Sequence, residues 1–533
     1  MKRVLTLALA LAMVVMSLAI PALADSDPVT LTMSVIWNNE NAYDPTIFNE
    51  MAEALGVNFD ITLIETDVAS EKMNLMFMSN TYPGIVTGSG ILSNADLINY
   101  GSEEGYLIPL NDLINEELTP HICELLAAND GWKEMMTMPD GNIYGIPNND
   151  SGGSGHGDVG YKLWINTAWL EAVGKEIPTT TDEFRDVLIA FKEGDPNGNG
   201  EADEIGLTGA TGTWAADPWL NLLNAFGYFN ENYYYVKDGT VYSILDQDYL
   251  REGLSWINSL YEEGLIDPGA FTQDLDALGT IGNADTLISG MVTCGHIGMY
   301  LDVNNYDNFK NWINIEPLEG PSGYKAIPYT TASSVSGAGF AITDVCENPE
   351  MAIRFADMVS SEEWTVRHQV GIKGIDWDDA DEGTFGMDGV TPAKYKYLTY
   401  TVSASNGETN KWGHTLRLLE YNWKNLFQVV GDIYDATNYE AYLYQNTVKL
   451  RPYAADVDMI APLMYENADD ATDLSTYRTN VGSYAKNAIV EFITGVRDID
   501  DDATWESFKK DLDGMNYPEM LELLQKTIAY MGY

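Results

Sequence analysis

Basic residues are scarce in this sequence. Its 533 residues include 28 lysines and arginines against 81 aspartates and glutamates, which gives a formal net charge of −53. A surface of this sign repels phosphate backbones and anionic lipids, so the composition argues against nucleic acid as a partner. It favours cation binding. It also disfavours an anionic ligand, because no basic cluster stands out along the chain.

Cysteine and histidine are scarce as well. Cys123, Cys294 and Cys346 are odd in number and far apart, so they form neither a disulfide framework nor a metal-binding spacing. One pair could be bridged, or all could be buried thiols. The chain contains no H-E-x-x-H pattern, no G-x-S-x-G nucleophile elbow and no P-loop. Paired carboxylates for glycoside hydrolysis stay open, since any two of the 81 acids could serve.

Residues 1–24 have the pattern of a cleaved signal peptide. Lys2 and Arg3 precede an apolar run over residues 4–20, and Ala22-Leu23-Ala24 forms an A-x-A cleavage site. A membrane anchor is the alternative, but the run ends in a proline and small residues rather than a stop-transfer flank. No cysteine precedes Cys123. We therefore expect an exported protein, extracellular or periplasmic, without a lipid anchor on an N-terminal cysteine.

The apolar pattern after residue 28 predicts that the mature chain begins with alternating strands and helices of an α/β fold. Residues 29–35 and 57–63 alternate as strands, residues 45–55 and about 70–80 have helical spacing, and residues 85–87 form a short strand. This order of elements predicts a parallel sheet. Ligands bind at the carboxyl ends of such strands, which makes Trp37, Asn38 and Ser89 candidates.

Further along, helices dominate the pattern. Thr180 and Glu183 form a capping box before a helix that ends at Gly194. Residues 347–361 form an amphipathic helix, and residues 475–494 and 505–530 form terminal helices. The segment His296–Tyr300 is predicted to be a short buried strand.

A candidate calcium loop follows the helix that Gly194 ends. Residues 195–206 read DPNGNGEADEIG, which matches the first half of an EF-hand loop: oxygen donors on alternate positions and a glycine at the sixth place. The match departs at the twelfth place, where Gly206 replaces a bidentate glutamate. A solvated acidic turn is the alternative. We expect a structural calcium ion, held by Asp195, Asn197, Asn199, Glu201 (through its carbonyl), Asp203 and Glu204.

Several segments carry a family resemblance. They are the block over residues 163–207, YGIP at 144–147, EEGLIDP at 262–268, ENPEMAIRFADMVSSEE at 347–363 and FITG at 492–495. In this order they resemble the extracellular solute-binding proteins of ABC importers, family 1. The resemblance is to the oligosaccharide-binding subgroup of LipO and alginate-binding type, which carries an EF-hand-like calcium loop. It spans nearly all of the mature chain.

The resemblance implies an α/β periplasmic-binding-protein type II fold, with two discontinuous lobes, mainly parallel central sheets and a hinge. It places residues 25–150 and about 335–455 in an N-lobe, and about 160–330 and 456–533 in a C-lobe that carries the calcium loop. The G-x-G-x-x-G at 155–160 lacks the strand before it that a dinucleotide site needs. It would instead be the first interlobe crossover.

The implied function is non-catalytic. A monomer would capture a neutral oligosaccharide between its lobes, close about the hinge, and deliver the ligand to ABC permease subunits. Sugar rings pack on aromatic faces, and the chain has 13 Trp, 32 Tyr and 15 Phe, most of which must be core. The candidate ligand contacts are Trp37, Asn38, Tyr82, Ser89, Trp164, Trp214, Tyr300, Trp377 and Trp412. Two alternatives stay open: a binding protein of the same fold for a peptide or another solute, and a secreted glycan-acting enzyme.

Overall fold

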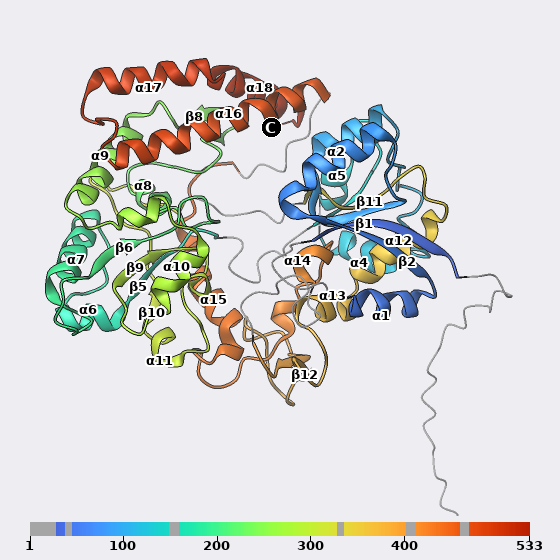
Figure 1. The fold of residues 1–533 in the computed structure, drawn as a ribbon, viewed down its shortest axis with the longest axis horizontal. Coiled ribbons are helices and arrows are strands. Elements are labelled where there is room, and N and C mark those ends of the chain that lie inside the picture. The colour runs from blue at the N-terminus through green and yellow to red at the C-terminus, as the bar shows by residue number, and fades with distance from the viewer. Residues whose placement is uncertain are drawn as a thin grey trace, which may run out of the picture.

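The protein consists of two groups of elements, each built around one β-sheet (Figure 1). The computed structural model describes residues 28–37, 45–129, 131–148, 159–327, 335–400, 412–458 and 468–532. We call the group that contains β1 the first lobe and the group that contains β5 the second lobe. The predicted signal peptide, Asn38 and most of the predicted first crossover lie outside the described residues.

The first lobe has a five-stranded mixed sheet in the order β2-β1-β3-β11-β4. Strand β1 pairs in parallel with β2 and β3, and β11 pairs antiparallel with β3 and β4. The three strands predicted near the N-terminus are confirmed. The strands are β1 (Thr30–Trp37), β2 (Asn58–Glu65), β3 (Ile85–Leu92), β4 (Ile146–Asn148) and β11 (Ser336–Ile342).

Helices cover both faces of this sheet. Met33 and Val35 of β1 pack in one cluster with α1, α4, α5 and α12, whereas Ile36 and Val86 face α2. Helix α1 ends at Gly56, whose φ of 68° suits a residue without a side chain. The helices are α1 (Thr46–Leu55), α2 (Ala69–Ser79), α3 (Asn94–Asp96), α4 (Pro120–Ala128), α5 (Trp132–Met136), α12 (Pro349–Val359), α13 (Glu362–Gln369) and α14 (Gly413–Leu416).

The second lobe has a four-stranded sheet in the order β10-β5-β9-β6. Only the β6–β9 pair is parallel, and β5 runs antiparallel to both β9 and β10. The expectation of a mainly parallel sheet is therefore wrong for this lobe. The reason is that β5 begins at the edge where the chain arrives from the first lobe, and the other strands end there. The strands are β5 (Leu163–Asn166), β6 (Ile205–Thr208), β9 (Ser289–Thr293) and β10 (Trp312–Asn314).

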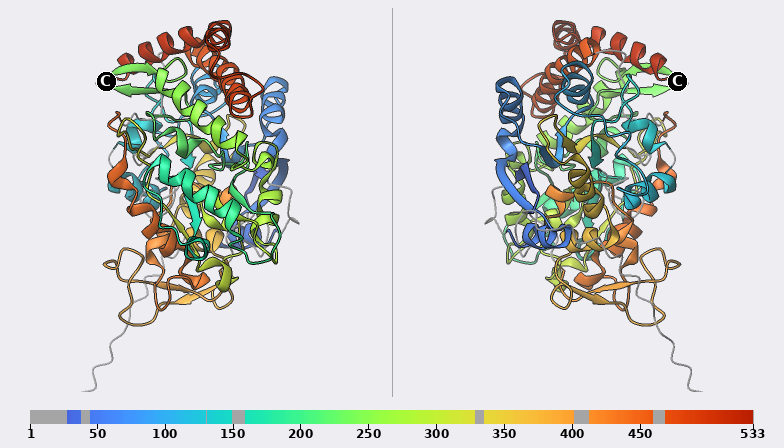
Figure 2. Two further views of the ribbon diagram at one scale, coloured as in Figure 1. Left: turned by 90° about the vertical axis from the view of Figure 1, so that its left-hand side faces the viewer. Right: turned by 90° about the vertical axis from the view of Figure 1, so that its right-hand side faces the viewer.

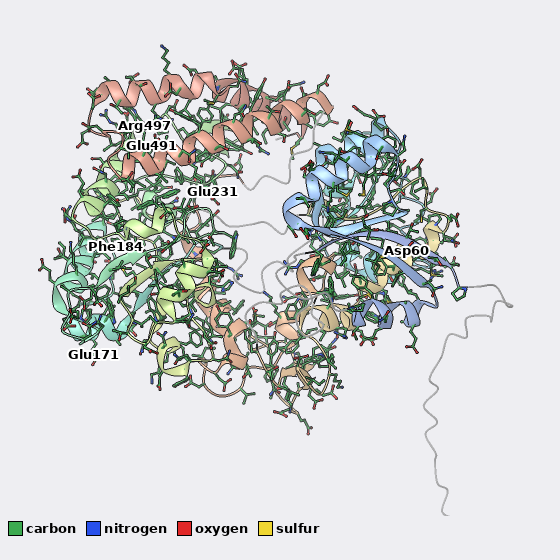
Figure 3. All side chains as sticks on the ribbon, in the orientation of Figure 1. Asp60, Glu171, Phe184, Glu231, Glu491 and Arg497 are labelled. Atoms are coloured by element: carbon green, nitrogen blue, oxygen red, sulfur yellow. The ribbon has the colours of Figure 1, made fainter. Side chains whose placement is uncertain are left out.

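Alternate residues of β5 face the two cores of this lobe. Leu163 and Ile165 pack with Phe184 of α7, which Figure 3 labels, and Trp164 packs on the opposite face. One core holds α6 (Thr167–Val173), α7 (Thr181–Gly194), α8 (Leu220–Leu223), α9 (Asp248–Glu262), α16 (Ala468–Ile493), α17 (Asp502–Gly514) and α18 (Tyr517–Tyr530). The other holds α10 (Leu275–Gly282), α11 (Tyr306–Phe309) and α15 (Tyr439–Val448).

Helix α15 belongs to the second lobe by its contacts. The Tyr442 hydroxyl donates a hydrogen bond of 2.6 Å to the carbonyl of Trp312, and the Asn314 side chain donates one of 2.9 Å to the carbonyl of Asn446. The sequence placed residues up to about 455 in the first lobe. The chain instead returns to the second lobe before Tyr439, which is its third passage between the lobes.

The chain also forms two antiparallel hairpins. Strands β7 (Tyr234–Lys237) and β8 (Thr240–Ser243) pack near α18, and β12 (Trp377–Asp379) pairs with β13 (Tyr395–Tyr397). Figures 1 and 2 place α16 to α18 at one end of the molecule and β12 at the other. Among the described helices, none is long and apolar enough to cross a membrane.

The segment His296–Tyr300 is not a strand. Its central residues, Ile297–Met299, form a 3-10 helix, and the buried strand is β9, which ends at Thr293. Two glycines within GHIGM favour a turn over an extended chain. Cys294, just before this turn, is a buried free thiol, and Cys123 and Cys346 are also free.

Candidate functional site

One edge of the second sheet gathers strand ends. Strands β6 and β9 end side by side, with Thr208 opposite Val292, and β5 begins there, with Leu163 opposite Thr293. The chain reaches this edge from the first lobe. In open α/β sheets, loops that follow the carboxyl ends of strands carry ligand contacts. The loop that follows β6 is therefore the first candidate for a ligand site.

This loop presents an exposed tryptophan. The side chain of Trp214 is 52% exposed, although the alanines that follow it are buried. Its ring lies over backbone: a Cβ on Gly160 would lie 3.4 Å from the ring, and a Cβ on Gly295 would overlap it. The next residue, Ala215, has a φ of 54°, a left-handed conformation that is costly for alanine. The loop thus holds Trp214 outward in a strained geometry.

The base of the Trp214 loop is anchored to α16. Asp217, only 2% exposed, accepts a hydrogen bond from the amide of Gly212 at 3.3 Å and pairs with the Lys486 ammonium at 3.2 Å. Burial raises the pKa of Asp217, and Lys486 opposes that rise. Because the Asp217 carboxylate is buried, removing its lysine partner would be costly, so this contact ties the base of the loop to α16. Sequence reasoning missed Asp217, because one acid among 81 gives no signal.

Three predicted ligand contacts are core residues instead. Trp164, Tyr300 and Trp412 each have no exposed surface. The Trp164 indole donates a hydrogen bond of 3.0 Å to the carbonyl of Cys294, directly under the segment that Trp214 covers. The expectation that these three side chains contact a ligand is not supported, because each fills a lobe core.

Tyr82 and Trp377 lie in small aromatic clusters. The Tyr82 hydroxyl donates a hydrogen bond of 2.8 Å to Asp344, and its ring lies 5.0 Å from that of Phe77. Burial, together with Asp344, raises the pKa of Tyr82 to about 12. The Trp377 indole donates to the carbonyl of Gly371 at 3.0 Å. Both are partly buried, and none of the contacts described joins them to Trp214.

The other two candidates that the structure describes lie at the first-lobe sheet. Trp37 is the last residue of β1 and packs partly buried on the first-lobe core. Ser89 belongs to β3, and its side chain is outside the described set. The structure therefore brings none of the first-lobe candidates into a described contact with the Trp214 loop.

His296 lies beside Trp214, with ring centroids 6.3 Å apart. Its Nδ1 is 3.1 Å from the hydroxyl oxygen of Tyr439, which also accepts a hydrogen bond from the amide of Gly298. Burial, and then the positive charges of Lys162 and Lys424, lower the pKa of His296 to about 3. The imidazole is therefore neutral. It adds aromatic surface beside Trp214 without adding a positive charge.

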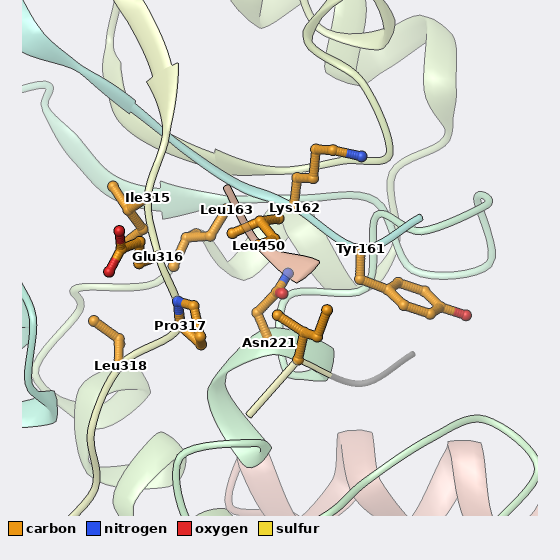
Figure 4. A pocket seen from close by; sticks show the side chains of 10 residues that line it. Tyr161, Lys162, Leu163, Asn221, Ile315, Glu316, Pro317, Leu318 and Leu450 are labelled. Carbon is orange, nitrogen blue, oxygen red and sulfur yellow. The ribbon is translucent and has the colours of Figure 1, made fainter. Parts of the chain in front are cut away.

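A small pocket lies behind this edge (Figure 4). It is lined by residues that include Tyr161, Lys162, Asn221, Glu316 and Leu450, and its space is about that of one water molecule. It is too small for a sugar ring. A ligand of that size therefore does not bind in this pocket.

The predicted calcium loop begins where α7 ends. Asp195 caps the helix with a φ of 48°, and Gly200 has a φ of 78°, which explains glycine at the sixth place. Thr180 caps the other end of α7 as predicted, but Glu183 reaches back to the amide of Thr179 rather than to that of Thr180. Helix α7 therefore ends directly before the loop, as the sequence predicts.

Within the loop the polar groups face one another. The side-chain nitrogens of Asn197 and Asn199 donate to the carboxylate of Asp203 at 3.1–3.2 Å, and the amide of Gly200 donates to Asp195 at 3.1 Å. Within the described residues, no group of three or more His, Cys, Asp or Glu side chains is arranged to hold a metal ion. The loop is closed by hydrogen bonds between its own groups.

Glu204 tests whether a cation fits. It is only 8% exposed, and its Oε1 accepts no hydrogen bond from any described residue. Burial raises the pKa of Glu204, and the charges of Asp203 and Asp195 raise it further. A buried oxygen without a donor, close to other acids, is a position that a hard cation would neutralise. The loop therefore has the oxygen chemistry that calcium prefers, and Glu204 is the acid available in place of the missing glutamate at the twelfth position, but the described acidic side chains are not gathered around one point.

The chain is similar to a known protein family and to characterised proteins. The family described as bacterial extracellular solute-binding protein matches residues 38–366. The fructooligosaccharide ABC transporter substrate-binding protein FusA of Streptococcus pneumoniae is 29% identical over 508 residues, which cover 93% of this chain and 89% of that protein.

Solved structures show the same fold. FusA as an EF-hand mutant in complex with fructo-nystose superimposes with a TM-score of 0.75 at 26% identity, covering 94% of this chain and 99% of that one. Alginate-binding protein AlgQ2 without calcium ion has a TM-score of 0.69 at 21% identity, covering 95% and 99%. The fold is thus that of the type II periplasmic-binding proteins, as predicted.

Proposed function

The chain belongs to the bacterial extracellular solute-binding proteins, and we propose that it captures a neutral oligosaccharide for an ABC importer. It would work outside the cytoplasm as a monomer that binds and releases its ligand without chemistry. The 29% identity to a fructooligosaccharide-binding protein over 93% of the chain supports this choice. Among neutral sugars, fructooligosaccharides are the first class to test.

Trp214 is the observation that carries the proposal. A half-exposed indole on a loop that is anchored at its base is a surface on which the apolar face of a sugar ring packs. The strained backbone at Ala215 supports a role for this exposure, since strain persists where function needs it. The net charge of −53 favours a neutral ligand over an anionic one. In this proposal, Trp37 and Trp377 are further contacts that join when the lobes close.

We propose that calcium binds at Asp195, Asn197, Asn199, Glu201, Asp203 and Glu204 and has a structural role. The loop lies between α7 and β6, so a bound cation would fix the start of β6 without touching the sugar. Delivery would require ABC permease subunits that recognise the closed form.

A thermal-shift screen of the protein with calcium present tests the proposal. The panel contains kestose and longer fructooligosaccharides, other neutral oligosaccharides, an oligomer of uronic acid and short peptides. A ligand at 100 times its dissociation constant should stabilise the folded state by about 2.7 kcal/mol. A shift with neutral glycans and no product on chromatography supports capture. A shift with peptides or uronates alone contradicts the neutral-sugar proposal, and product formation would establish an enzyme.

A further inference from the structure

A buried ammonium lies beneath the Trp214 loop. Lys162, just before β5, is only 1% exposed. Its Nζ donates to the carbonyl of Val159 and, at 3.4 Å, to the carbonyl of Gly295. Figure 4 shows its side chain running away from Glu316. A buried charge is costly unless it is hydrogen-bonded, and these two carbonyls are acceptors for this group.

Both carbonyls belong to the backbone on which Trp214 rests. Val159 directly precedes Gly160, and the Trp214 ring lies against Gly160 and Gly295. Gly160 and Gly295 are 135 residues apart in the chain. Lys162 therefore ties together two separate segments that together support one indole ring.

The same ammonium also holds the segment that arrives from the first lobe. Val159 packs with Ile327 and Leu450 in a small apolar cluster, and the amide of Ile327 donates to the carbonyl of Tyr453 at 2.9 Å. Val159 and Ile327 lie next to the first and second passages of the chain between the lobes. Lys162 therefore binds the backbone close to where the chain enters and leaves the second lobe.

We propose that Lys162 is a positioning residue that sets the orientation of Trp214. An apolar side chain of similar length could fill the same space, but it could not bind both carbonyls at once. Without the ammonium, the segments under the ring would be free to separate, and the ring would lose its fixed support. The consequence for affinity rests on the proposed sugar-binding function, whereas the consequence for the ring does not.

Fluorine NMR of ligand-free protein labelled with 5-fluorotryptophan tests the positioning directly. The Trp214 resonance is assigned by its loss in W214F. In K162M, this resonance should shift or broaden, while those of Trp169 and Trp256 stay unchanged. Leu450→Ala is the matched control, because it disturbs the same apolar cluster but touches neither carbonyl. It should leave the Trp214 resonance in place.

Affinity for kestose, or for the neutral glycan that gives a thermal shift, is the second readout. We expect K162M to bind about tenfold more weakly, because neighbouring groups in one network are energetically coupled. If K162M does not fold, Lys162→Gln replaces it, since glutamine can keep one of the two bonds. An unchanged Trp214 resonance in the folded variant overturns the proposal. A moved resonance with unchanged affinity keeps the positioning role and instead counts against Trp214 as a sugar contact.

Discussion

The two ends of strand β6 carry opposite chemistry. Just before the strand, residues 195–204 form an acidic loop closed by hydrogen bonds between its own polar groups. Just after it, Trp214 presents an uncharged aromatic face. The strand between them is only four residues long, Ile205–Thr208, and is paired with β9 along its length. One short strand thus connects a candidate cation site to a candidate sugar site.

The difference shows how one lobe can separate stability from recognition. The acidic loop uses most of its donors internally, and Asn197 also donates to the carbonyl of Leu287 at 3.1 Å, so its contribution is to order the chain that enters the sheet. The Trp214 loop is already anchored by Asp217 and Lys486, so it depends little on that order. Changes at the acidic end should therefore move stability, and changes at the aromatic end should move affinity. Four predictions test this separation.

The largest predicted effect is a difference in stability between two tryptophan variants near the aromatic end of β6. Trp164→Ala removes a fully buried side chain from the second-lobe core and should cost about 3–5 kcal/mol of the free energy of unfolding. Trp214→Ala removes a half-exposed side chain and should change stability by less than about 0.5 kcal/mol. Urea unfolding of both variants measures this. Comparable losses in the two would mean that Trp214 is a core residue.

Glycan affinity should depend strongly on Trp214, although stability should not. Trp214→Ala should weaken binding of the glycan found in the screen by about 2 kcal/mol, or about 30-fold, as buried aromatic anchors do. Trp214→Phe keeps a flat ring and should lose less. Isothermal titration at saturating calcium measures both. If Trp214→Ala binds as tightly as the unchanged protein, the aromatic end is not the sugar site.

Calcium removal should act at the acidic end alone. Chelation should lower the thermal midpoint, since calcium at 100 times its dissociation constant stabilises the folded state by about 2.7 kcal/mol. Asp195→Ala should remove this calcium-dependent stabilisation. Glycan affinity, measured with and without chelator below the melting range, should change by less than about threefold. A larger loss of affinity than of stability would break the separation between the two ends of β6.

The sequence predicted the local elements of these regions well, because their signals are local. Helix α7 and its N-cap follow from the spacing of apolar residues and from Thr180, and the loop follows from alternate oxygen donors. The family resemblance supplied the fold. Among the aromatics, the sequence could not separate Trp214 from Trp164, because exposure depends on which face of a loop or strand meets a distant core.

Other features needed the three-dimensional contacts. Lys162 supports Trp214 through Gly295, which lies on a different strand end, so no spacing in the sequence indicates it. The direction of β5 depends on where the chain crosses between lobes, and this made the second sheet largely antiparallel. The position of α15 likewise depends on its bonds to Asn314 and Trp312. Long-range contacts of this kind leave no periodic pattern.

The smallest predicted effect sharpens the role of Glu204. Its pKa is raised in the folded protein by burial and by Asp203 and Asp195, so without a cation the folded state holds this proton more tightly than the unfolded chain does. Its stabilising contribution is therefore present at low pH and is lost as pH rises through the raised pKa. Glu204→Gln removes the ionised form and should make the chelated protein about 1 kcal/mol more stable near pH 7. It should also flatten the pH dependence and reduce the gain from calcium.

Thermal midpoints in chelator from about pH 4.5 to 7 measure the difference that the Glu204 carboxylate makes. Glu201→Gln is the matched control, because Glu201 is exposed and is proposed to offer only its backbone carbonyl. The control should keep both the pH dependence and the calcium response of the unchanged protein. If Glu204→Gln is instead the less stable protein in chelator, its carboxylate already has a stabilising partner without calcium. The acidic end of β6 would then be a closed turn, and its contrast with the Trp214 end would be one of shape rather than of cation binding.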